Sequence, residues 1–139
     1  MEKALALLQS ITDDDLDAGE RLFAADAEWV ELPLGLVYRA PTGWHDNVNY
    51  WRTGFEDGHV DVTNAIDSGD FVVLEYVGSG VNTGRLVTPQ GVIEPNGELV
   101  VADFVDVWEF RDGLIARGRS YVGGLLAQLA KPAPGSRQT

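Results

Sequence analysis

Apolar positions recur at helical spacing at the start of the chain. Leu5, Leu8 and Ile11 are three residues apart, which places them on one face of a helix. Thr12 and the three aspartates after it are typical of the N-cap and acidic first turn of a second helix. We expect that helix to continue to Phe23.

Residues 42–54 show the clearest helical pattern. A threonine can cap the start of this segment, and a glycine can end it. Its apolar side chains fall at positions i, i+4, i+7 and i+11 and form one stripe. The stripe consists of Trp44, Val48, Trp51 and Phe55.

After Gly58 the apolar period changes from that of a helix to that of a strand. Clusters of Pro, Gly, Asp and Ser separate the apolar runs and indicate turns at 33–35, 67–70 and 111–113. The predicted strands are 27–32, 36–39, 60–65, 71–77, 99–110 and 114–121, and a short helix is expected at 125–129. Helices followed by an antiparallel meander predict an α+β domain in which a curved antiparallel sheet wraps around the helices.

Length and composition narrow the class of protein. The 139 residues suit one domain, which we place at 1–130, and the Pro-, Gly- and Ser-containing tail 131–139 is expected to be disordered. The absence of cysteine excludes disulfides and favours the reducing cytoplasm. A formal net charge of −12 argues against a nucleic-acid partner. No apolar run approaches the roughly 20 residues of a membrane span, and no secretory signal is visible.

Several short motifs occur in an order and spacing that together resemble a known family. They are Phe23-Ala-Ala-Asp-Ala27, Trp29-Val-Glu-Leu-Pro33, Gly80-Val-Asn-Thr-Gly84, Glu94-Pro-Asn-Gly-Glu98, Asp106-Val-Trp-Glu-Phe-Arg-Asp-Gly113 and Leu125-Leu-Ala-Gln-Leu129. The chain resembles the SnoaL-like polyketide cyclases of the nuclear transport factor 2-like superfamily, which includes the ketosteroid isomerases and limonene epoxide hydrolases. The resemblance covers about residues 16–129. It implies a cone with a deep pocket, usually a homodimer, and no metal or organic cofactor.

The chain departs from this family at residues that carry chemistry. Asn82 stands where the family often has histidine, and an amide does not titrate near neutral pH. Gly123 stands where the last strand of the cyclases commonly has an aspartate acid/base, and Ser120 where an epoxide hydrolase would need one. These differences favour an alternative, in which the pocket binds a hydrophobic molecule without turnover.

Two acids remain at positions that matter in the ketosteroid isomerases. The resemblance puts Glu31 at the proton-abstracting carboxylate, and counting back from Pro33 would put Leu32 there. We prefer Glu31 because it shares a strand face with Trp29. Asp106 matches the oxyanion-hole acid of the isomerase. The alternatives are that Glu31 is a rim acid paired with Arg39 and that Asp106 is buried only for hydrogen bonding.

A carboxyl group in an apolar pocket has a raised pKa, so one such acid can serve as a base and another as a proton donor. We therefore expect cofactor-independent cyclisation or isomerisation of a polyketide-like or terpenoid carbonyl compound, with Glu31 and Asp106 as catalytic residues. The expected substrate-binding residues are Trp29, Tyr50, Asn82, Phe104, Trp108 and Tyr121.

Other side chains have less distinctive sequence contexts. The isomerase's helix-one tyrosine falls at Leu7, and Tyr121, Tyr50 or Tyr38 is a possible substitute. His45 and His59 are interpreted as surface residues, and Trp44 and Trp51 as core. The two histidines and the scattered acids show no metal-ligand spacing. A pure interaction domain is a third possibility.

Overall fold

The computed structural model describes residues 1–124, so the expected helix at 125–129, the tail 131–139 and the domain boundary at 130 lie outside the described residues. The helices are α1 (Glu2–Thr12), α2 (Leu16–Glu20) and α3 (Gly43–Gly54). The strands are β1 (Phe23–Leu32), β2 (Leu36–Arg39), β3 (His59–Ser68), β4 (Phe71–Val81), β5 (Leu86–Thr88), β6 (Gly91–Ile93), β7 (Leu99–Arg111) and β8 (Leu114–Gly123). The sequence did not predict the small β5–β6 hairpin.

The second helix begins later and ends earlier than its sequence pattern indicates. Asp15 is the N-cap in place of the predicted Thr12, and its carboxylate accepts a hydrogen bond from the backbone of Ala18. Phe23 is the first residue of β1 and does not continue the helix as expected. Phe23 stacks on Trp29, with ring centroids 4.4 Å apart, so tertiary packing overrides the local helical spacing.

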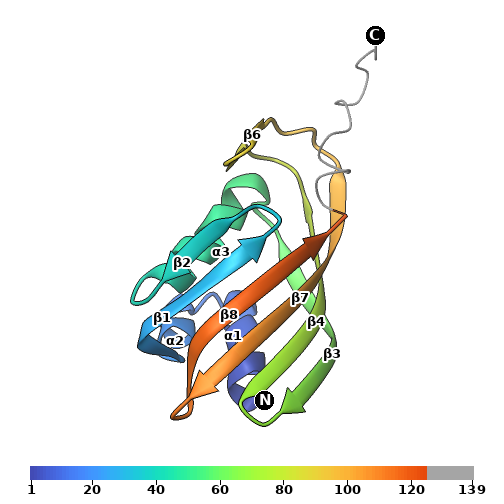
Figure 1. Cartoon of the computed structure of the whole chain (residues 1–139). Coiled ribbons are helices and arrows are strands. Elements are labelled where there is room, and N and C mark those ends of the chain that lie inside the picture. Colours follow the sequence, from blue (N-terminus) through green and yellow to red (C-terminus); the bar gives the residue numbers. More distant parts are fainter. Residues whose placement is uncertain (125–139) are drawn as a thin grey trace.

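Six strands form one curved sheet in the order β2-β1-β8-β7-β4-β3 (Figure 1). The pairs β1–β2, β3–β4, β4–β7 and β7–β8 are antiparallel, but β1 and β8 run parallel. The expectation of a wholly antiparallel sheet is therefore wrong at this pair. The reason is topological: β8, the last strand of the described residues, lies beside β1, the first strand, and runs in the same direction.

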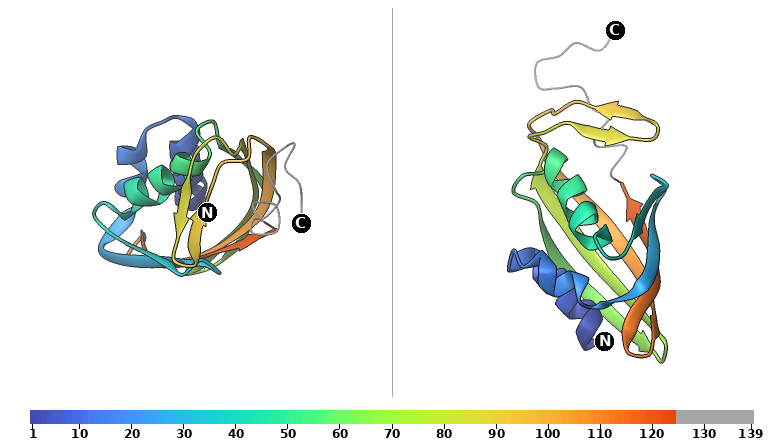
Figure 2. Two further views of the ribbon diagram at one scale, coloured as in Figure 1. Left: turned by 90° about the horizontal axis from the view of Figure 1, so that it is seen from above. Right: turned by 90° about the vertical axis from the view of Figure 1, so that its left-hand side faces the viewer.

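The three helices lie on the concave side of the sheet (Figure 2). One core cluster joins α1 and α3 to inward residues of β1, β4, β7 and β8, and a smaller one surrounds Phe55, Leu86 and Val100. The pocket described below takes lining residues from both clusters, so it lies between them. Helix, curved sheet and pocket together confirm the predicted α+β cone.

Strand register places the polar and aromatic side chains of the concave face in rows across neighbouring strands. Glu31 on β1 is paired with Ser120 on β8, and Ser120 is paired with Asp106 on β7. The two acids are thus separated by a single strand. In the adjacent row Gly118 lies between Trp29 and Trp108, whose rings contact each other edge to face at 6.0 Å. The glycine leaves the space in which the two indoles meet.

Replacing Gly118 by alanine should destabilise the protein by about 1–3 kcal/mol, because overpacking strains a well-packed core. An added Cβ would lie 2.3 Å from two ring carbons of Trp108. Urea unfolding measures the effect. Gly123→Ala on the same strand is the matched control, because its Cβ would approach nothing closer than 3.7 Å. Equal stability of the two variants would contradict this account of the aromatic row.

Candidate functional site

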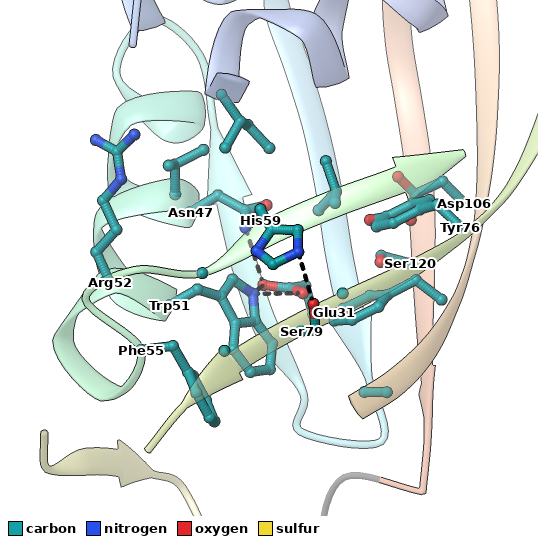
Figure 3. Close-up of a pocket in the computed structure, with 18 of the residues that line it drawn as sticks. Glu31, Asn47, Trp51, Arg52, Phe55, His59, Tyr76, Ser79, Asp106 and Ser120 are labelled. Carbon is teal, nitrogen blue, oxygen red and sulfur yellow. Dashed lines mark hydrogen bonds between the residues drawn. The ribbon is translucent and has the colours of Figure 1, made fainter. Parts of the chain in front are cut away.

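A pocket opens between α3 and the concave face of the sheet (Figure 3). It has about 840 Å³ of empty space when its open mouth is included. The part that can be compared with the cavities of other ligand sites is about 110 Å³, so the enclosed space is small. The walls are mostly apolar and aromatic, and the aromatic members are Trp44, Trp51, Phe55, Tyr76, Phe104 and Trp108. Glu31 and Asp106 are both 2% exposed and both line it, so the structure places the two predicted acids in one pocket.

Glu31 is held by donors from α3. The indole N–H of Trp51 donates to both carboxylate oxygens, at 2.9 and 3.0 Å, and the amide Nδ2 of Asn47 donates to Oε1 at 3.0 Å. Arg39, the alternative partner, forms its ion pair with Glu28 instead. Glu31 is therefore a pocket residue and not a rim acid.

Asp106 is held from the neighbouring strand. The hydroxyl of Tyr76 on β4 donates to Oδ1 of Asp106 at 3.1 Å. Tyr76 lies diagonal to Asp106 in the β4–β7 register, a separation that a long side chain spans. The tyrosine ring stacks on Phe104 with centroids 5.0 Å apart, which fixes the direction of its hydroxyl.

Burial raises the pKa of both acids. Desolvation raises the pKa of Glu31 to about 8; the hydrogen bonds from Trp51 and Asn47 oppose this rise, and the charge of Asp106 adds to it. Desolvation likewise raises the pKa of Asp106 to about 7. Hydrogen bonds from the hydroxyls of Ser120 and Tyr76 and from the indole of Trp108 oppose this rise. Two interacting carboxyls with pKa values near neutrality can accept and donate protons at physiological pH.

The predicted binding residues divide into two groups. Phe104 and Trp108 line the pocket. Trp29 is buried behind the lining, where its indole donates to Asn47 at 2.8 Å. Tyr50 lies outside the lining too, and its hydroxyl donates to the carbonyl of Val87.

Asn82 and Tyr121 are also outside the pocket lining. The amide of Asn82 donates to the carbonyls of Gly54 and Gly84 and accepts from the backbone of Asn96, so its hydrogen-bonding groups connect three segments of backbone. Tyr121 is 43% exposed because it alternates with Ser120 and points to the convex face. The structure thus gives neither residue a contact with the pocket.

Sequence reasoning missed four side chains that complete the site: Asn47, Trp51, Tyr76 and Ser120. Trp51 was interpreted as core, but it lines the pocket and binds Glu31. Tyr76 and Ser120 occupy inward positions of their strands, a signal that alternation could have supplied. Asn47 is next to Val48 of the apolar stripe of α3. That position was the only sequence signal for a role of Asn47 in the pocket.

The mouth of the pocket carries two basic side chains. Arg52 forms an ion pair with Asp14 at 3.0 Å, which connects α3 to the turn after α1. His59 is exposed as expected, and its Nε2 lies 3.0 Å from the hydroxyl of Ser79. Within residues 1–124 no group of three or more His, Cys, Asp or Glu side chains could hold a metal ion. In the same part of the chain no helix is long and apolar enough to cross a membrane.

Comparisons with solved structures agree with this geometry. A protein from Catenulispora acidiphila DSM 44928 with a ketosteroid isomerase-like fold, in complex with trimethylamine, is 23% identical, with 98% of each chain covered and a TM-score of 0.75. A putative SnoaL-like polyketide cyclase from Jannaschia sp. CCS1 is 19% identical over 94% of this chain and 92% of that one, with a TM-score of 0.75. IdmH, a putative polyketide cyclase from Streptomyces antibioticus, is 21% identical over 94% and 97%, with a TM-score of 0.71.

At these identities the structures establish the fold. No protein with a curated description matches the sequence. The family model of the SnoaL-like domain matches residues 4–118, which is most of the chain. The protein therefore belongs to the SnoaL-like domain family.

Proposed function

We propose that the protein catalyses a cofactor-independent acid/base reaction on a small polyketide-like or terpenoid carbonyl compound, either a cyclisation or an isomerisation. The observation that carries this proposal is the presence of two buried carboxyl groups with raised pKa values in one apolar pocket. The family and its polyketide cyclase neighbours support this reaction class. Homodimer assembly and a cytoplasmic location remain predictions.

The hydrogen bonds suggest a role for each acid. Trp51 and Asn47 both donate to Glu31, and both of its oxygens accept. This pattern suits a carboxylate that removes a proton next to the carbonyl. Asp106 accepts from Tyr76 through Oδ1, and its protonated form would donate a hydrogen bond to the substrate carbonyl. Proton removal by Glu31 and hydrogen-bond donation by Asp106 would together form and stabilise an enolate.

The enolate can then react in two ways. Attack of its carbon on a second carbonyl closes a ring, and the oxygen of that carbonyl takes up a proton. Return of the proton from Glu31 to a different carbon moves a double bond. In either case the apolar walls exclude water, which strengthens the hydrogen bonds to the developing charge.

A direct test measures enolisation without knowledge of the natural substrate. The bicyclic aromatic ketone 2-tetralone is incubated with the protein in D₂O, and loss of its α-protons is followed by NMR. We expect exchange to be faster with the protein than without it. An unchanged exchange rate for this ketone and for a panel of polyketide-like ketones would contradict the proposed activity.

A second candidate is ligand binding without turnover. The observation that favours it is the aromatic pocket itself, together with the structural neighbour in complex with trimethylamine. This candidate predicts that 2-tetralone quenches tryptophan fluorescence on binding but shows no accelerated exchange.

A further inference from the structure

Two buried hydrogen bonds connect Trp29 to Glu31 through Asn47. The indole Nε1 of Trp29 donates to Oδ1 of Asn47 at 2.8 Å, and Nδ2 of Asn47 donates to Oε1 of Glu31 at 3.0 Å. All three residues are buried. Trp29 does not line the pocket, whereas Asn47 and Glu31 do.

The chemistry of the indole determines which way the amide points. An indole N–H is a donor and never an acceptor, so the amide group that faces it must be the oxygen. The amide NH₂ of Asn47 is thereby left facing Glu31. A free asparagine could turn its oxygen toward a protonated Glu31, but this arrangement opposes that rotation.

The same arrangement favours the ionised form of Glu31 and so opposes the rise in pKa that desolvation causes. An amide donor stabilises the carboxylate and offers no acceptor to the carboxylic acid. Trp51 donates to both oxygens of the same carboxylate, so the two donors together restrict its rotation. The contact from Trp29 also polarises the amide, which strengthens the donor that reaches Glu31.

We propose that Trp29 and Asn47 form a positioning relay that keeps Glu31 oriented as a proton acceptor toward the pocket, with Trp29 acting through Asn47 and without touching the ligand. The biological meaning of this relay rests on the proposed function, but its physical effect on Glu31 does not. Trp29, expected from the sequence to contact substrate, is thereby assigned a different role.

The test measures the titration of Glu31 directly, with no substrate present. Protein labelled with ¹³C at the glutamate side chains is titrated by NMR, and the Glu31 signal is assigned from Glu31→Gln. Asn47→Leu should raise the pKa of Glu31 by about 1–2 units, the value of one hydrogen bond to a charged group. Trp29→Phe keeps the aromatic packing and should raise it by at least a few tenths of a unit.

Trp44→Phe is the matched control. Trp44 lies in the same core cluster, and its indole makes one buried hydrogen bond, to the hydroxyl of Ser10 at 2.9 Å. The control loses an equivalent bond that is not connected to Glu31, so the Glu31 titration should move less than in Trp29→Phe, although Trp44 also lines the pocket. A shift in the control as large as that in Trp29→Phe would overturn the relay, since general loosening would then explain both.

The wild-type protein supplies a second measurement that requires no folded variant. The indole N–H signal of Trp29 should shift as Glu31 titrates, and by more than that of Trp44, whose indole bonds Ser10. A Trp29 signal that does not follow Glu31, or a Glu31 titration that is the same in wild type, Asn47→Leu and Trp29→Phe, overturns the proposal. Failure of the proposed function would be seen separately, as an absence of ketone exchange in a protein whose relay titrates as expected.

Discussion

Replacing Glu31 by glutamine, or Asp106 by asparagine, is expected to lower the rate of ketone exchange by about 10²- to 10⁴-fold, the usual contribution of a general acid or base. Each substitution retains the size of the side chain but removes its ability to exchange a proton. Both acids are in the pocket wall, and neither has a neighbouring carboxyl on its own strand that faces the same pocket. The rate is measured with 2-tetralone in D₂O at saturating concentration.

Matched controls come from acids on the outer face of the same sheet. Asp103 lies on β7 with Asp106 but is exposed, and Glu75 on β4 accepts a hydrogen bond from Asn64 outside the pocket. Asp103→Asn and Glu75→Gln should keep the wild-type rate. If Glu31→Gln and Asp106→Asn also keep it, the two acids do not perform the chemistry proposed for them.

The rate should depend on pH as a bell-shaped curve with its maximum between about 7 and 8. The pair is active when it holds one proton, with Glu31 ionised and Asp106 protonated. Because the pKa of Glu31 is the higher of the two, this is the less populated of the two arrangements of that proton. Below a pH of about 7 both carboxyls are protonated, and above about 8 both are ionised. A rate that rises steadily to pH 10 would show that a single base is sufficient.

Stability should fall by several kcal/mol as the pH rises from 5 to 8, because two buried acids have raised pKa values. In the unfolded chain the carboxyls of Glu31 and Asp106 have their ordinary pKa values of 4.5 and 3.8, and folding raises them to about 8 and about 7. Between these limits the folded protein holds protons that the unfolded chain has lost. Each group then lowers the free energy of unfolding by about 1 kcal/mol per pH unit.

Urea unfolding of the double variant Glu31→Gln/Asp106→Asn isolates this effect. The variant should lose most of the pH dependence and be more stable than wild type at pH 8. His45 contributes in the same direction, because Glu20 and Asp17 raise its pKa and its stabilisation is lost as the pH rises, but it is present in both proteins. Parallel pH curves for the two proteins would mean that the pocket acids do not titrate as described.

The sequence determined the elements whose signals are local. The stripe of residues 42–54 predicted α3 because one face of that helix packs against the sheet. The dipeptide Asp112-Gly113 predicted the β7–β8 hairpin, since both residues have the positive φ that a tight turn requires. Alternation on β1 put Glu31 on the same face as Trp29, and alternation on β7 grouped Asp106 with Phe104 and Trp108.

Only the tertiary structure decided what these faces contact. A period of two shows that Glu31 shares a face with Trp29, but it does not show which face is concave or which strand lies alongside. The parallel pairing of β1 with β8 supplied Ser120, and the packing of α3 supplied Asn47 and Trp51. Asn82, chosen for its place in a motif, uses its amide to hold backbone, and Tyr121 points away from the pocket. Side-chain type and spacing are properties of the chain, whereas desolvation and the choice of hydrogen-bond partner arise only when distant segments pack together.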